Sequence, residues 1–237
     1  MEILKLINTV EVRSSLYRGI KSYVLRNNTL DADQIEILNK AGDDYYQEFI
    51  ASPLDAKTLF KDPSKEVIIE IGFGMGAATK QIAKDRNQYN YLGIEVYLLG
   101  FTKLLSDVYH AKLDNIRLMR FNAVDVLENM ICDNSIEGFH IFFPDPWPKK
   151  RHHKRRLIQK EFVELMAKKL KKGGYLYIAT DWVEYAEYIL EVLNECSELE
   201  NKYDKFAPKV EWRKQTKFEK KGLDKNYSIS EIWFEKV

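Results

Sequence analysis

The sequence predicts an α/β protein with a doubly wound, mostly parallel sheet. Between about residues 66 and 196, short apolar runs rich in β-branched and aromatic residues alternate with longer segments of helical spacing. The short runs are apolar throughout rather than at every second position, which is typical of strands covered on both faces. Apolar residues make up 45% of the 237 residues, so the chain can form one domain with a substantial core.

Each expected strand is placed by one such apolar run. The first, over 67–71, stops at Gly72, and the fifth follows Gly173 and Gly174, which are expected to end the preceding helix. The tail from Val210 is expected to hold two more strands, the clearer over 228–234. The second to fifth strands are predicted over 91–96, 116–121, 139–143 and 175–179.

Helices are expected between these strands. One helix precedes the sheet, over 31–50, with Asp31 as its N-cap. The next begins after the glycines that follow the first strand and runs to about Asp85. The remaining helices are predicted over 97–112, 123–131, 157–171 and 182–196.

The overall charge excludes a chain that is basic throughout. There are 37 Lys and Arg against 36 Asp and Glu, a formal net charge of +1. This balance conceals two basic stretches: residues 149–160 carry seven cations and no acid, and residues 205–225 carry eight cations against three acids. For either stretch, a solvated face is the alternative explanation.

Hydropathy and cysteine usage indicate in which cellular compartment the protein is expected. No uninterrupted apolar stretch approaches the ~20 residues of a membrane span, and the N-terminus lacks the pattern of a secretion signal. Cys132 and Cys196 lack metal-like spacing, so no metal is expected. The sequence therefore predicts a cytoplasmic protein with reduced cysteines and no membrane partner.

The predicted strand ends carry the candidate functional residues, because ligands of parallel sheets bind where the strands end. After the first strand, Gly72, Gly74 and Gly76 leave the backbone open to a bulky ligand at a helix N-terminus. Glu70 precedes them and would repel a pyrophosphate but attract an ammonium or sulfonium group. A tight strand-to-helix turn without a ligand is the alternative interpretation.

The next two strand ends suit an adenosine. Glu95 can accept hydrogen bonds from both hydroxyls of a ribose. The oxygen of Asn122, which Ala123 follows, can accept from an adenine amino group, although a helix cap alone also explains it. Together with Glu70, these residues indicate a site for S-adenosylmethionine, an adenosine with a sulfonium and an amino-acid tail.

The fourth strand leads into a proline-rich loop that holds one acid. Pro144, Pro146 and Pro148 fix φ at three of five positions and make the loop rigid. Asp145 is thereby held beside the expected methyl donor, which makes it the candidate catalytic residue. A surface turn is the alternative.

A basic run follows this loop directly. It comprises Lys149, Lys150, Arg151, His152, His153, Lys154, Arg155 and Arg156. Six permanent cations in eight residues predict a surface for phosphates, and the adjacent histidines lack the spacing of a helical metal pair, so they are expected to face RNA. Cations of the second basic stretch would extend this surface, among them Arg213, Lys214, Lys217, Lys220 and Lys221.

Five segments of the chain resemble the bacterial tRNA (guanine-N7)-methyltransferases. They are 70–76, 93–95, 142–149, 179–182 and 216–219, and the resemblance runs from about residue 20 to the C-terminus. It implies a Rossmann-like class I methyltransferase fold with seven strands, the last antiparallel. It also implies transfer of a methyl group from S-adenosylmethionine, which becomes S-adenosylhomocysteine, to the variable-loop guanosine of tRNA, giving 7-methylguanosine.

The resemblance also implies roles for residues. Glu70, Glu95, Asn122 and Asp145 would line the cofactor site; Lys149, Asp181, Thr216, Lys217, Phe218 and Glu219 would contact the target nucleotide; and Arg151 to Arg156 would contact the RNA. Many members of the family carry Asp where this chain has Asn122, whose amide oxygen is still an acceptor. Residues 1–60 would form a partly mobile, helical N-terminal extension and 61–237 the catalytic domain, in a monomer or homodimer.

Other functions explain only part of these observations. An NAD-dependent oxidoreductase shares the strand–glycine–helix opening, but Glu70 and the G-x-G-x-G spacing disfavour it. A methyltransferase of proteins or small molecules leaves the basic run without a role. A non-catalytic RNA-binding protein leaves Glu70, Glu95 and Asp145 without a role. A methyltransferase of another RNA remains an alternative.

Overall fold

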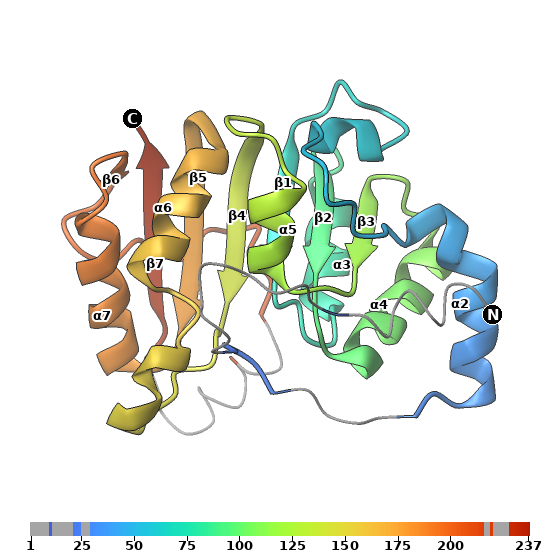
Figure 1. Cartoon of the computed structure of the whole chain (residues 1–237), viewed down its shortest axis with the longest axis horizontal. Coiled ribbons are helices and arrows are strands. Elements are labelled where there is room, and N and C mark those ends of the chain that lie inside the picture. Colours follow the sequence, from blue (N-terminus) through green and yellow to red (C-terminus); the bar gives the residue numbers. More distant parts are fainter. Residues whose placement is uncertain (1–9, 11–20, 25–28, 216–218, 220–227) are drawn as a thin grey trace.

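A seven-stranded sheet forms the centre of the computed structural model, which describes residues 10, 21–24, 29–215, 219 and 228–237 (Figure 1). The strand order is β3-β2-β1-β4-β5-β7-β6. Only β7 is antiparallel to its neighbours, which confirms the predicted doubly wound, mostly parallel sheet with an antiparallel last strand. The strands are β1 Val67–Ile71, β2 Asn90–Ile94, β3 Ile116–Met119, β4 Ile136–Phe142, β5 Leu170–Thr180, β6 Leu199–Asn201 and β7 Ser230–Lys236.

Helices cover both faces of the sheet. In Figure 1, α5, α6 and α7 lie in front of the strands and α3 and α4 lie behind them. Helix α2 packs at the outer side of α4, where the rings of Tyr45 and Tyr109 meet edge to face at 6.5 Å. The helices are α2 Ala32–Tyr45, α3 Ala77–Asp85, α4 Leu98–Ala111, α5 Ala123–Asn129, α6 Lys160–Lys169 and α7 Val183–Asn194, with short 3₁₀ helices η1 Ala56–Leu59 and η2 Lys150–Arg155.

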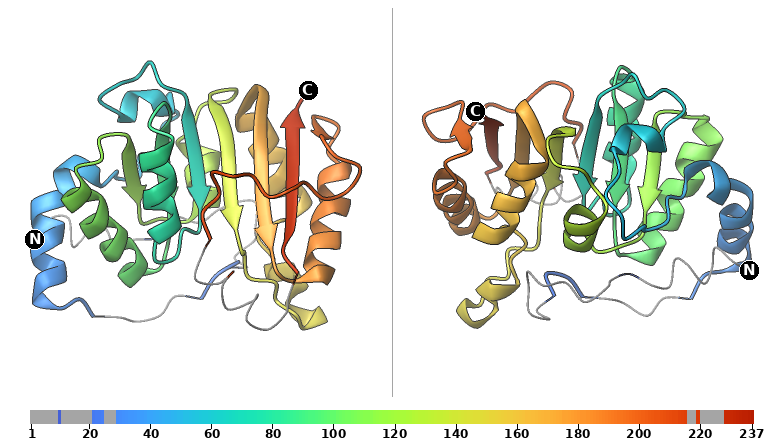
Figure 2. Two further views of the ribbon diagram at one scale, coloured as in Figure 1. Left: turned by 180° about the vertical axis from the view of Figure 1, so that it is seen from behind. Right: turned by 45° about the horizontal axis from the view of Figure 1, so that its top comes forward.

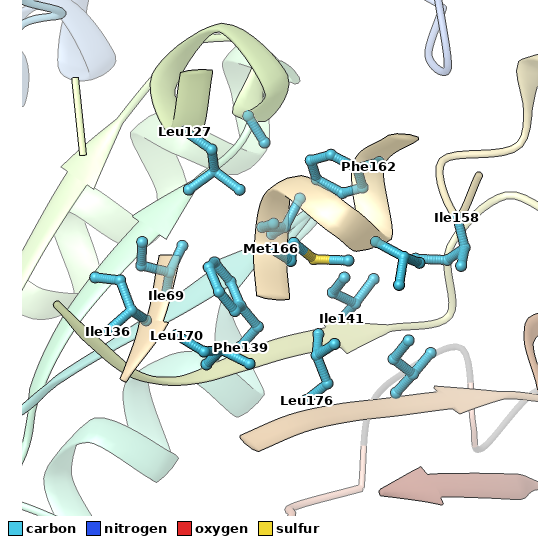
Figure 3. Close-up of a cluster of buried hydrophobic side chains, with 14 of the residues drawn as sticks. Ile69, Leu127, Ile136, Phe139, Ile141, Ile158, Phe162, Met166, Leu170 and Leu176 are labelled. Atoms are coloured by element: carbon cyan, nitrogen blue, oxygen red, sulfur yellow. The ribbon is translucent and has the colours of Figure 1, made fainter. Parts of the chain in front are cut away.

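Apolar side chains fill the front layer. Phe139 and Ile141 of β4 point toward Phe162 and Met166 of α6, and all four are fully or almost fully buried (Figure 3). Because successive strand residues point to opposite faces, their neighbours His140 and Phe142 belong to the rear layer. This packing fixes β4, whose end leads to Asp145.

The rear layer is more polar, and the C-terminal part of the chain crosses it. Figure 2 (left) shows the segment before residue 215 passing in front of β7 and β5. Ala207 pairs with Glu231 of β7, and the Trp212 ring stacks on the His140 ring of β4 with centroids 4.8 Å apart. The segment therefore crosses the adjacent strands β7, β5 and β4.

The local predictions agree with the structure apart from a few boundaries. Asp31 caps α2 with a capping box, as predicted, but the helix ends at Tyr45 because the chain leaves it in an extended conformation at Tyr46. Gly173 and Gly174 do not separate α6 from β5: they lie within β5, which starts directly after the helix, and Gly173 has a φ of +77°. A glycine inside a strand here marks an irregularity rather than a helix end.

One of the two strands predicted after Val210 is β7. The other is not found within the described residues 210–215, and most of the stretch from there to β7 lies outside the described residues. Besides β5, β7 pairs with β6, a three-residue strand that the sequence did not predict. So short an edge strand carries little apolar pattern to read. Among the described residues, no helix is both long and apolar enough to cross a membrane.

Candidate active site

The carboxyl ends of the parallel strands surround a cavity of about 330 Å³. Its lining includes predicted residues from four strand ends, namely Gly72, Gly74, Glu95, Asn122, Ala123 and Asp145. A larger hollow of about 700 Å³ lies between α2 and α4, but none of the predicted site residues lines it. The smaller cavity is therefore the candidate active site.

The glycine turn after β1 leaves room for a ligand. Gly72 and Gly74 have φ values of +79° and +56°, which side chains rarely adopt. A Cβ atom at either position would meet nothing within 4 Å, so the backbone borders open space there. Gly76 caps α3 with a φ of +71° but does not line the cavity.

Glu70 lies behind this turn rather than in the cavity wall. It is 3% exposed and accepts a hydrogen bond from Thr79 Oγ1 at 2.9 Å, whereas its Oε2 atom has no partner among the described residues. Burial raises the pKa of Glu70 to about 8, the hydrogen bond from Thr79 opposes this rise, and Glu95 adds to it. The structure thus places a buried, neutral carboxyl beneath the turn at neutral pH.

Glu95 joins three parts of the site. Its Oε2 accepts from the backbone N–H of Gly74 at 2.7 Å, and its Oε1 accepts from Val96 and Tyr97 at 2.7 and 2.9 Å. Burial raises the pKa of Glu95, while these three hydrogen bonds favour the ionised form and the nearby Asp145 disfavours it. The carboxylate therefore fixes the glycine turn to the start of α4 and still faces the cavity.

The structure shows one of the two functions that the sequence left open for Asn122, the helix cap. Its side-chain oxygen accepts from the N–H of Val124 at 3.1 Å and so caps α5. The same residue and Ala123 line the cavity. A second lone pair on the oxygen leaves it able to accept from a ligand as well.

The loop that carries Asp145 is held in an unusual conformation. Phe143 and Trp147 have φ values of +55° and +45°, which cost non-glycine residues on the order of 1–3 kcal/mol each. The Phe143 N–H donates to Ala179 O of β5 at 2.7 Å. The loop thus has a strained backbone on both sides of Asp145. Asp145 itself is exposed at the cavity.

The basic run forms η2, which projects below the carboxyl ends of the strands in Figure 1. Lys149, Lys150, Arg151 and Lys154 are exposed, and His152 and His153 are half-buried. Arg155 lies 4.9 Å from the centre of the Trp147 ring, which His152 contacts edge to face at 5.8 Å. Burial lowers the pKa of His152, and the nearby charges of Arg151, Arg155, Lys149 and Lys154 lower it further. These residues place positive charge beside Asp145.

Arg156 differs from the rest of the run and corrects the expectation that it faces RNA. Its side chain is fully buried and forms an ion pair with Glu184 of α7. The sequence could not show this, because the acidic partner lies 28 residues further along the chain.

The other predicted substrate contacts separate into three groups. Asp181 follows β5 and is half-buried. Thr216, Lys217 and Phe218 lie outside the described residues. Glu219 is 2% exposed, and both of its oxygens bind Arg213, so its carboxylate is turned inward and not toward a substrate.

Two of the five cations named for the second basic surface are described, and both pair with acids. Arg213 is fully buried and pairs with Glu219 and Glu231. Lys214 pairs with Asp85 at 3.0 Å. The remaining cations named for this surface, Lys217, Lys220 and Lys221, lie outside the described residues.

Sequence reasoning missed the contribution of the N-terminal part of the chain. Ser22, Tyr23 and Val24 line the cavity, and the Trp147 indole N–H donates to Ser22 O at 3.3 Å. Asn122 N–H donates to Val10 O at 2.6 Å. These residues belong to no motif, and they follow a segment without a clear pattern, so the sequence gives no strong signal for them.

The residues around the cavity fit S-adenosylmethionine. The glycine turn offers backbone without side chains where a bulky group must approach, Glu95 and Asn122 present acceptors for an adenosine, and the volume is within the range of small-molecule sites. Within the described ranges, no group of three or more His, Cys, Asp and Glu side chains is arranged to hold a metal ion.

Comparison with known proteins shows that this chain is similar to methyltransferases. A family model described as "Putative methyltransferase" matches residues 64–232. The tRNA (guanine-N(7)-)-methyltransferase of Francisella philomiragia subsp. philomiragia is 46% identical over 93% of this chain and 96% of its own length. Those of Chromobacterium violaceum and Neisseria meningitidis serogroup B are 46% and 43% identical over 92% and 93% of this chain, and over 96% and 92% of their own lengths.

Solved structures agree on the fold. The crystal structure of the 16S rRNA methyltransferase KamB superposes with a TM-score of 0.54 over 92% of this chain and 99% of that one, at 11% identity. At this identity the likeness concerns the fold alone.

Proposed function

The chain belongs to the family of tRNA (guanine-N7)-methyltransferases, and we propose that it transfers a methyl group from S-adenosylmethionine to N7 of the variable-loop guanosine of tRNA. One observation supports this most directly. A cavity suited to the cofactor contains Asp145, and the exposed cations of η2 begin within a few residues of it. A nucleoside-sized site and a phosphate-binding surface thus lie side by side.

The reaction needs alignment more than proton transfer. Guanine N7 has an in-plane lone pair and no proton at neutral pH, so its attack requires no general base. When bound, S-adenosylmethionine supplies a methyl group on a positively charged sulfur. The protein has to hold the guanine in line with that group and to stabilise the positive charge that develops on the ring.

Asp145 is suited to both tasks. Its carboxylate lies at the cavity, on a loop whose backbone is fixed by prolines and by the hydrogen bond from Phe143 to β5. There it accepts hydrogen bonds from guanine N–H groups and lowers the energy of the forming cation. Asp181, which follows the neighbouring strand β5, is a second carboxylate placed to orient the base.

The exposed cations of η2 bind the RNA. They are Lys149, Lys150, Arg151 and Lys154, which can contact phosphates without reading sequence. Recognition then depends on the shape of the folded tRNA. The target guanosine must leave its stacked position to reach the cavity. A reduced, cytoplasmic setting agrees with the two free cysteines, Cys132 and Cys196.

Methyl transfer to bulk unmodified tRNA tests the proposal. The protein is incubated with S-adenosylmethionine labelled in the methyl group, and the RNA is digested to nucleosides. We expect label in 7-methylguanosine alone, at the variable loop. Label in another nucleoside would indicate a different RNA methyltransferase, and binding without transfer would indicate an RNA-binding protein.

Asp145→Asn separates catalysis from binding. Loss of the charge with retention of the size should reduce the single-turnover rate by roughly 10²–10³-fold, the usual effect of removing one electrostatic contact to a transition state. Affinities for S-adenosylmethionine and tRNA should change little. A rate close to wild type would contradict the role given to Asp145.

A further inference from the structure

Arg156 forms a buried connection between the Asp145 loop and α7. Its Nε donates to Pro146 O at 3.0 Å, and Pro146 directly follows Asp145. Its Nη1 donates to Glu184 Oε1 at 3.1 Å, and its Nη2 pairs with Glu184 Oε2. The guanidinium therefore links the backbone next to Asp145 to the first turn of the helix that follows Asp181.

The surroundings of Arg156 leave it no access to RNA. Its side chain is fully buried, and its guanidinium carbon lies 4.8 Å from the Tyr185 ring centre and 5.0 Å from that of Tyr188. Nη2 also lies 3.2 Å from Nε2 of His153. The guanidinium of Arg156 is thus enclosed by the two tyrosine rings and by its hydrogen-bond partners.

A lysine could not replace these contacts. The carbonyl of Pro146 and both oxygens of Glu184 are bound by three different nitrogens of one rigid plane, a geometry that an ammonium group does not have. The ion pair with Arg156 also lowers the pKa of Glu184, so the pair stays ionised at neutral pH. These contacts hold a loop that contains residues of positive φ on both sides of Asp145.

We propose that Arg156 and Glu184 are positioning residues, which keep Asp145 at the cavity for methyl transfer, and that Arg156 takes no part in binding RNA. The activity measurements that test this inference rest on the proposed function. The inference assigns Arg156 a different role from the five lysines and arginines that precede it in the basic run, although all six carry the same charge.

Two variants test the pair. Arg156→Lys keeps the charge but loses the Nε donor to Pro146, and Glu184→Gln keeps the shape but loses the ion pair. Glu187→Gln is the matched control, because Glu187 lies on the same helix and, within the described part of the chain, forms an ion pair only with the exposed Lys205. Melting temperatures identify any variant that is not folded under the assay conditions.

We expect both variants to lower the single-turnover rate by roughly 10- to 100-fold, as small displacements of catalytic groups do. The affinity for tRNA and its salt dependence should stay at wild-type values. The double variant should be no slower than the slower single variant, because both substitutions break one connection. Glu187→Gln should behave as wild type.

Hydrogen exchange gives a second measurement that does not depend on activity. The amide of Phe143, whose hydrogen bond to Ala179 O fixes the start of the Asp145 loop, should exchange faster in both variants than in the wild type or in Glu187→Gln. If the wild-type protein failed to methylate tRNA, the proposed function would be wrong, and this exchange would still decide the inference. Unchanged exchange, or a loss of tRNA affinity in Arg156→Lys at an unchanged rate, would overturn it.

Discussion

The two basic stretches of the chain carry charge of the same sign and are used differently. In the run 149–156, the described structure gives only Arg156 an acidic partner, and four of the remaining cations are exposed. In residues 205–214, each of the four cations pairs with an acid. Charge that is left without an acidic partner is available to a polyanion, whereas paired charge holds the fold together.

Each stretch contains one fully buried arginine. Arg156 binds one carboxylate and one carbonyl beside the active-site loop, and Arg213 binds two carboxylates and the hydroxyl of Tyr177. A guanidinium can satisfy several partners at once in a fixed plane, which suits it to buried positions better than an ammonium group. The described lysines of both stretches lie at the surface or near it.

Removal of the buried charge in the second stretch should have the largest effect on stability. Arg213→Met leaves Glu219 and Glu231 buried without their cation, and breaking such a pair costs about 3–5 kcal/mol. Arg151→Met, in the exposed part of the first stretch, should change the free energy of unfolding by less than about 0.5 kcal/mol. Urea unfolding measures both, and similar values for the two variants would remove the distinction between the stretches.

Glu70 is a buried carboxyl that has no ion pair among the described residues, in contrast to Glu219 and Glu231. Its folded pKa of about 8 lies above the ordinary value of 4.5, so the folded state holds a proton that the unfolded state releases between these values. Relative to Glu70→Gln, the wild type should lose stability as the pH rises through this window, at up to about 1.4 kcal/mol per pH unit. Unfolding at a series of pH values without cofactor measures this, and parallel curves for the two proteins would show that Glu70 is ionised when folded.

The exposed cations of the first stretch should control RNA affinity without affecting stability. Arg151→Gln and Lys154→Gln each remove one candidate phosphate contact, so each should weaken tRNA binding and reduce the slope of log K against log salt concentration by about 0.9. Filter binding at several salt concentrations gives these slopes. An unchanged slope in the double variant would place the RNA on another surface.

The sequence predicted the parts of the site that depend on local pattern. The glycine turn, the cap at Asn122 and the rigid loop around Asp145 follow from residues adjacent in the chain, and the apolar runs give the strands to within a few residues. The burial of Arg156 could not be predicted, because it depends on a carboxylate that only the packing of α7 brings close. The same holds for Arg213 and Glu231, and for the hydrogen bonds that join Glu95 to the glycine turn.

The smallest effects are expected for Lys214, and this residue gives the most direct test of the difference between the two basic stretches. Its ion pair with Asp85 is partly exposed on both sides, so Lys214→Gln should change the free energy of unfolding by less than about 1 kcal/mol. Because its charge is already paired, the salt dependence of tRNA binding should stay the same, in contrast to Lys154→Gln. A reduced slope for Lys214→Gln would mean that the RNA competes with Asp85 for this cation. Pairing in the free protein would then no longer distinguish the two stretches, and the RNA-binding surface would extend across both.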